Sequence, residues 1–123
     1  MKTLGAATCI LWAGITCAQA LTPDMTVDFS WIGTRLCSPT PVSPEFLVQH
    51  APEGTHRLRF ALTNSAGREL GGAEVALPAG GAIAKGTVSF RPPCVGGMYT
   101  WTVDALDAGG KVLGSAKLTR PFF

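Results

Sequence analysis

FRPPCVGGMYTWTVDALDAGGKVLGSAKL, residues 90–118, contains the clearest pattern of two paired strands in the sequence. Its second third alternates apolar and polar side chains from Tyr99 to Ala105, as a strand buried on one face requires. The turn Asp107–Gly110 follows, and its glycines reach the positive φ angles of a tight turn without steric cost. The alternation then resumes from Val112 to Leu118. We therefore predict an antiparallel hairpin here, and an antiparallel β class for the chain.

Shorter stretches before this hairpin repeat the same alternation. Turn-forming residues separate them, and no amphipathic helical period is seen after residue 20. With the two strands of the hairpin they make about seven short strands, which predicts an all-β fold, an antiparallel β-sandwich, with an open barrel as the alternative. The five further strands are expected at Met25–Trp31, Glu45–Gln49, Arg57–Thr63, Gly72–Leu77 and Gly86–Phe90.

Residues 1–20 have the pattern of a secretory signal peptide. Lys2 precedes an apolar run, residues 4–15, and Ala18-Gln19-Ala20 supplies the small residues of a cleavage site. We predict cleavage after Ala20, which leaves residues 21–123 as one periplasmic or secreted domain without a membrane span. The alternatives are an uncleaved membrane anchor, for which the apolar run is short, and lipid attachment at Cys17, whose preceding residues lack the usual leucine and small-residue pattern.

The four cysteines divide into two groups. Cys9 and Cys17 would leave with the signal peptide, so the mature chain keeps Cys37 and Cys94. In an oxidising compartment such a pair forms a disulfide, and closing a loop of roughly 57 residues would contribute about 4 kcal/mol. A redox pair or a metal site is the alternative, but neither CxxC spacing nor a neighbouring histidine supports it.

The charges and the positions of the histidines indicate whether the chain binds nucleic acid or a metal ion. The chain has 10 basic and 8 acidic residues, and no basic stripe is evident, so nucleic acid is excluded as a partner. His50 and His56 flank a turn, where we interpret them as exposed histidines. A metal site is the alternative, with only Glu53 near in sequence as a further ligand. The sequence predicts no metal and no cofactor.

Enzymatic chemistry finds no support in the residue pattern. Asp104 lies on the polar face of the predicted strand and Asp107 opens the turn, which disfavours an acid–base pair. The serines lack a nucleophile elbow or a histidine context. No helix follows Gly71–Gly72 or Gly80–Gly81 to cradle a phosphate, so we interpret both pairs as turn glycines. We predict that the chain is not an enzyme.

The order of several short motifs resembles the phosphatidylethanolamine-binding protein family, in its short secreted bacterial form. The strongest is a proline–cysteine loop that leads into an aromatic strand ending in Ala-Leu-Asp. The resemblance spans nearly all of the predicted mature chain. The matching pieces are Asp28-Phe29-Ser30-Trp31, Cys37, Ser43-Pro44-Glu45-Phe46, Pro52-Glu53-Gly54-Thr55, Leu58-Arg59-Phe60, Gly71-Gly72, Arg91-Pro92-Pro93-Cys94 and residues 99–107.

The resemblance implies a β-fold with a small anion pocket at one end. In the family an aspartate and two histidines line it, and Asn64, Leu70 and Met98 stand at those places here. Leucine and methionine donate no hydrogen bond to a phosphate, so the usual anion-binding residues are largely replaced. Arg91 could supply a charge at the rim, and a solvated arginine is the alternative. The resemblance thus implies a candidate pocket of Asn64, Leu70, Gly71, Gly72, Arg91, Pro92, Pro93, Met98 and Tyr99.

Two functions from different classes remain after these observations. The first is an exported, non-enzymatic binding protein that takes a small anionic ligand at the pocket the resemblance implies. The second is an immunoglobulin-like module that presents a surface to a protein partner, which the sandwich pattern and the missing pocket histidines favour. A concave site beneath the loop from Pro92 to Tyr99 would indicate the first, and a flat exposed apolar patch the second.

Overall fold

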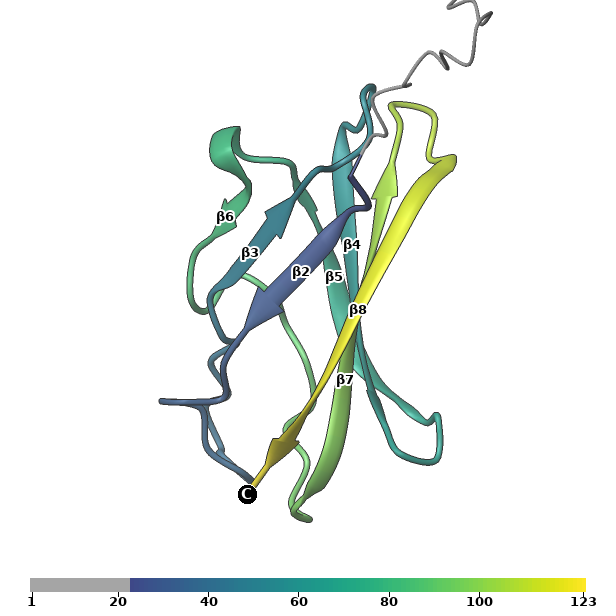
Figure 1. The fold of residues 1–123 in the computed structure, drawn as a ribbon. Helices are drawn as coiled ribbons and strands as arrows, with labels where there is room; N and C mark the ends of the chain where they lie inside the picture. The colour runs from purple at the N-terminus through teal and green to yellow at the C-terminus, as the bar shows by residue number, and fades with distance from the viewer. Residues whose placement is uncertain (1–22) are drawn as a thin grey trace, which may run out of the picture.

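The structure, a computed structural model, describes residues 23–123, and its regular elements are almost entirely strands (Figure 1). A 3₁₀ turn, η1 (Ala79–Gly81), is the helical element of this range, so no helix within it is long and apolar enough to cross a membrane. The predicted signal peptide, residues 1–20, lies outside the described range. The strands are β2 (Thr26–Phe29), β3 (Phe46–Gln49), β4 (Arg57–Asn64), β5 (Glu69–Ala76), β6 (Ala82–Ile83), β7 (Gly97–Leu106) and β8 (Val112–Phe122).

These strands form two antiparallel sheets that face each other. One sheet has the order β2-β3-β6, and the other has the order β5-β4-β7-β8. In Figure 1 the three-stranded sheet lies to the left of the four-stranded one. The all-β class with two antiparallel sheets is thereby confirmed. The predicted hairpin is confirmed as well, because β7 pairs with β8 from Gly97 opposite Phe122 to Leu106 opposite Val112.

Aromatic side chains fill the space between the sheets. Trp101, in the middle of β7, is fully buried and packs edge-on against Phe46 of the opposite sheet, with ring centroids 5.0 Å apart. Trp31 stacks on Phe122 with a centroid separation of 3.9 Å, which joins the segment after β2 to the end of β8. The alternating residues predicted to face inward on β4 are buried too. Side-chain alternation therefore determined the inner face correctly.

The prediction of a strand at Gly86–Phe90 is wrong. Val88 and Phe90 are buried as their alternation suggested, but the segment does not pair with a strand. The backbone N–H of Val88 donates instead to the buried hydroxyl of Ser43 at 3.1 Å, and Ser89 Oγ donates to the carbonyl of Gly72 at 3.2 Å. The short β6 takes the place of this strand, pairing with β3 through Ala82 and Ile83.

Gly71 and Gly72 are not turn glycines, because both lie inside β5. A Cβ on Gly72 would approach the carbonyl oxygen of Phe60 to 1.8 Å, so only glycine lets β5 lie this close to β4. Gly71 has a φ of 95°, and a Cβ there would lie 3.1 Å from Cα of Phe90. The glycine pair therefore serves the packing of β5 against β4 and against the segment before Arg91.

Candidate ligand pocket

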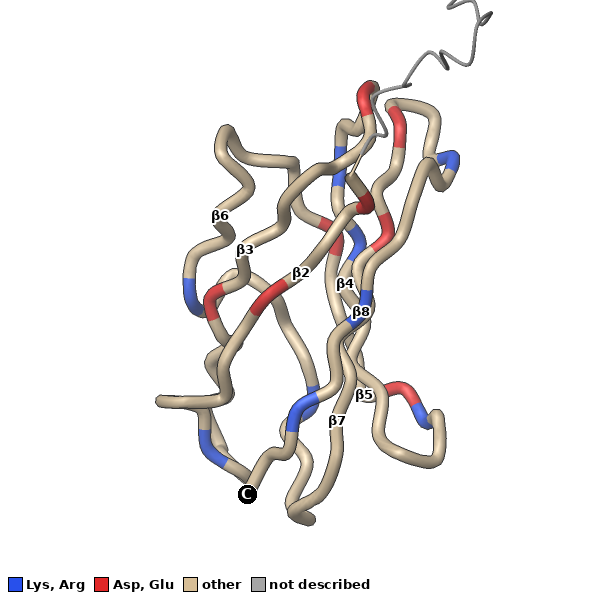
Figure 2. The backbone as a smooth tube through the Cα atoms, in the orientation of Figure 1, with Lys and Arg blue, Asp and Glu red and all other residues tan. Residues whose placement is uncertain are grey.

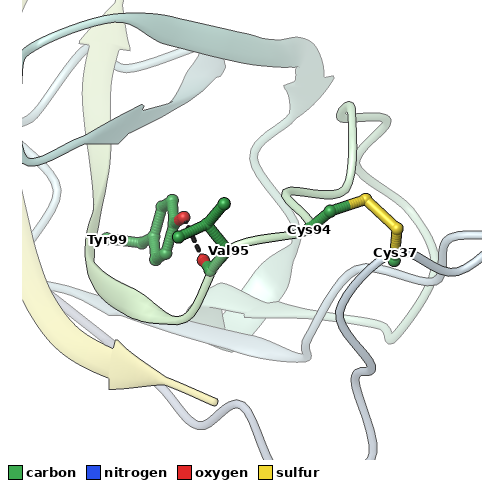
Figure 3. The surroundings of a disulfide bond; sticks show 4 residues. All are labelled: Cys37, Cys94, Val95 and Tyr99. Atoms are coloured by element: carbon green, nitrogen blue, oxygen red, sulfur yellow. Dashed lines mark hydrogen bonds between the residues drawn. A yellow bond between two sulfur atoms is a disulfide. The ribbon is translucent and has the colours of Figure 1, made fainter.

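The loop before β7 is held in place by one covalent bond and two hydrogen bonds. Cys94 forms the predicted disulfide with Cys37, with Cα atoms 4.3 Å apart, and the N–H of Cys37 donates to the carbonyl of Pro93 at 2.8 Å. The hydroxyl of the buried Tyr99 donates to the carbonyl oxygen of Val95, as Figure 3 shows. This hydrogen bond ties the loop to the start of β7. The loop is therefore a rigid wall and not a free connection.

The turn between β4 and β5 faces this loop. Asn64 ends β4, and its side-chain Oδ1 accepts from the backbone N–H groups of Ala66 at 3.0 Å and Arg68 at 2.9 Å. Asparagine is suited to this role because its short side chain bonds the backbone of its own turn. Asn64 also lies opposite Tyr99 in the β4–β7 register. The register thus brings the turn and the loop before β7 to the same end of the sandwich.

A pocket of about 230 Å³ lies between this turn and this loop. Its walls come from the end of β4, the start of β5, the segment after Phe90 and the start of β7. Apolar and cationic side chains share the lining, and no carboxylate side chain belongs to it. The lining residues are Asn64, Arg68, Leu70, Arg91, Pro93, Cys94, Val95 and Tyr99.

Two guanidinium groups give the pocket its charge. Arg91 is anchored to β5, because its backbone N–H donates to the carbonyl of Leu70 at 2.7 Å. Its guanidinium Nη2 donates to the backbone carbonyl of Glu69 at 2.8 Å. Neither Arg91 nor Arg68 forms an ion pair with any residue in the range 23–123, whereas Arg57, Arg59 and Arg120 each pair with a carboxylate. The positive charge at this pocket is therefore left available to a bound anion.

The structure brings together five of the nine residues proposed for the site. Asn64, Leu70, Arg91, Pro93 and Tyr99 line the pocket. The Tyr99 hydroxyl already donates to Val95, so it can offer a ligand only an acceptor.

The other four proposed residues lie outside the lining. Met98 lies on the alternate face of β7 from the buried Tyr99, pairs with Pro121 and is exposed. Gly71 and Gly72 support the wall from within β5, and Pro92 is half-buried beside Pro93. Met98 therefore contributes nothing to this pocket.

Sequence reasoning missed three of the lining residues, namely Arg68, Cys94 and Val95. Cys94 and Val95 are close in sequence to Tyr99 and could have been included on that ground. Arg68 has no local signal, because an arginine in a polar turn is usually solvated. Its place follows only when the β4–β7 register sets the Asn64 turn beside the loop before β7.

The other polar candidates lie at the opposite end of the sandwich. Asp104 accepts from Arg59 at 2.8 Å and from Ser115 at 2.5 Å, and Asp107 Oδ1 accepts from two backbone N–H groups of its own turn. His50 and His56 are exposed, and within residues 23–123 no three His, Cys, Asp or Glu side chains are grouped to hold a metal. The carboxylates named here thus support local structure.

The chain was compared with known proteins in three ways. No family model matches it, and neither a curated protein nor a solved structure is significantly similar to it.

Proposed function

We propose that this chain is an exported, non-enzymatic binding protein that takes a small phosphate-bearing anion at the pocket between the β4–β5 turn and the loop before β7. One observation carries the proposal: Arg68 and Arg91 line one pocket that contains no carboxylate side chain. Export is supported by the Cys37–Cys94 disulfide, which is typical of proteins in oxidising compartments. The resemblance to the phosphatidylethanolamine-binding protein family supports an anion site at one end of such a fold.

The donors at this pocket suit a phosphate. A guanidinium group binds phosphate oxygens through charge-assisted hydrogen bonds, which are roughly twice as strong as neutral ones. Asn64 uses its Oδ1 for the turn, and its amide NH₂ has no hydrogen-bond acceptor among the described residues. In this proposal the two arginines and the Asn64 amide replace the histidines of the family, so the chain keeps the position of the anion site with a different set of donors.

The test is a calorimetric titration of the purified, exported protein with inorganic phosphate and with phosphoethanolamine. We expect binding that weakens about tenfold or more in Arg91→Gln or Arg68→Gln, because each variant loses a charged hydrogen bond. Arg57→Gln is the matched control, since it removes the same charge at the other end of β4. Absence of binding at millimolar ligand, or equal weakening by all three variants, would refute the proposal.

A second candidate is the immunoglobulin-like interaction module. It is favoured by the strand order, because β2-β3-β6 facing β5-β4-β7-β8 corresponds to strands A-B-E facing C′-C-F-G of such sandwiches. The bond from Tyr99 near the start of β7 to a backbone carbonyl upstream resembles their tyrosine corner. The same titration separates the two candidates, since an interaction module of this kind would not bind phosphate at its pocket arginines.

A further inference from the structure

Three exposed apolar side chains gather at the end of the molecule that carries the pocket. Val95 is 72% exposed, Phe123 is 84% exposed and Met98 is 46% exposed. A Cβ added to Gly96 would lie 2.6 Å from Cδ1 of Phe123, so this ring covers the loop next to Val95. Met98 pairs with Pro121, two residues before Phe123. We call Val95, Met98 and Phe123 the apolar tip.

Val95 cannot withdraw into the core. The disulfide fixes Cys94, the residue before Val95, and the Tyr99 hydroxyl donates to the backbone carbonyl of Val95. The loop that carries it lies at the lower extreme of the ribbon in Figure 1, just before β7. The disulfide and the Tyr99 hydrogen bond thus hold this loop in place while the Val95 side chain stays exposed.

Arginines surround this tip. Arg68 and Arg91 line the pocket together with Val95, Arg120 lies opposite Tyr99 in the β7–β8 register, and Arg35 is two residues from the cysteine bonded to Cys94. The nearby side-chain carboxylates are Glu69, beside Arg68, and Asp28, which pairs with Arg120 at 3.0 Å. In Figure 2 basic segments outnumber acidic ones at this lower end, and most acidic segments lie above it. The end is therefore apolar at its tip and cationic around it.

We propose that this end docks on an anionic membrane surface, with Val95 and Phe123 entering the interface and Arg68 and Arg91 binding lipid phosphates. An apolar projection with a basic surround is how peripheral proteins attach to anionic lipids, because burial of the tip and attraction of the charges add together. We favour a membrane over a protein partner because arginines adjoin the exposed apolar side chains, and cationic residues of this kind are attracted to anionic lipid headgroups. The inference rests on the proposed function only in that the same arginines would take the phosphate.

The test is co-sedimentation of the exported protein with vesicles of phosphatidylcholine containing phosphatidylglycerol, beside vesicles of phosphatidylcholine alone. We expect binding to the anionic vesicles that added salt weakens, and little binding to the neutral ones. The double variant Val95→Ser/Phe123→Ser should lose about tenfold or more in vesicle affinity, since burying each CH₂ at the interface favours binding. Val112→Ser is the control, because Val112 is 46% exposed at the opposite end of the hairpin.

Two outcomes overturn the inference. One is the absence of binding to anionic vesicles, and the other is equal binding by the tip variant and the Val112→Ser control. The titration with soluble phosphate distinguishes failure of the membrane-docking proposal from failure of the proposed function. Phosphate binding without vesicle binding would remove the docking surface and keep the pocket. Vesicle binding that depends on Val95 and Phe123, without binding of soluble phosphate, would keep the docking surface and remove the pocket. An unchanged unfolding midpoint in the tip variant shows that its fold is intact.

Discussion

The two ends of the four-stranded sheet are built differently. At the end where β7 finishes, the hairpin turn satisfies itself: Asp107 Oδ1 accepts from Gly109 at 2.9 Å and from Lys111 at 2.8 Å. The arginines of that half, Arg57 and Arg59, pair with carboxylates. At the end where β7 begins, a disulfide holds the loop, and although Arg120 pairs with Asp28, Arg68 and Arg91 form no ion pair with any residue from 23 to 123.

This difference supports the proposal that the end with Val95 and Arg91 carries the binding site. Asp107 and Asn64 both use a side-chain oxygen for their own turn, but the Asn64 turn also presents the Asn64 amide NH₂ and Arg68 at a pocket. Loops that a rigid scaffold holds in place, with charges and apolar side chains still exposed, are where binding sites usually lie. We therefore propose a structural role for the hairpin end, which we call the Asp107 end, and a binding role for the end with Val95 and Arg91.

Removing the disulfide should have the largest effect. The variant Cys37→Ser/Cys94→Ser opens a loop with a sequence separation of 57 residues. We expect the free energy of unfolding to fall by about 4 kcal/mol, chiefly because the unfolded chain gains freedom. Denaturant unfolding at equilibrium measures this, and phosphate affinity should fall in the same variant because Cys94 lines the pocket. Unchanged stability would show that the covalent tie is dispensable.

Tyr99→Phe should have an intermediate effect. The variant keeps the buried ring and removes the hydroxyl that donates to Val95. We expect unfolding to become easier by about 1–2 kcal/mol, the range for losing one partly buried hydrogen bond. Phosphate affinity should also weaken, because the loop wall is no longer fixed at Val95. The measurements are the unfolding midpoint and the phosphate titration. If both stay as in the unmodified protein, the loop is held by the disulfide alone.

Asp107→Ala is the matched change at the Asp107 end and should have the smallest effect. It removes the acceptor for the N–H groups of Gly109 and Lys111, so we expect a loss of about 1 kcal/mol in unfolding free energy. Phosphate affinity should stay the same, because Asp107 follows the end of β7 and the pocket lies at its start. A weaker titration in this variant would contradict the division between the two ends.

Local alternation predicted the inner face of the fold well, because burial on one side of a strand leaves a period of two in the sequence. Trp101, Phe60 and Leu58 are buried as that period indicates. Alternation does not reveal whether a buried segment has a partner strand. Val88 and Phe90 alternate and are buried, yet the N–H of Val88 bonds the Ser43 side chain. Pairing of this kind depends on residues far away in the sequence.

The residues of the candidate site came from the resemblance and not from alternation, and the structure brings some of them together. Asn64, Arg91 and Tyr99 stand beside turn and loop signals that the sequence shows, and they converge on one pocket. Met98 was included because the resemblance puts it where the family has a histidine, but successive residues of a strand point to opposite faces, and Met98 is exposed. Arg68 could not be placed without the register that sets Asn64 opposite Tyr99.

The most direct test of the division between the two ends is a phosphate titration of isotope-labelled protein followed by amide chemical shifts. The account predicts saturable shifts in residues 64–68 and 91–99, and unchanged signals in residues 107–111. Shifts concentrated at the Asp107 end, or no saturable shift anywhere at millimolar phosphate, would contradict it.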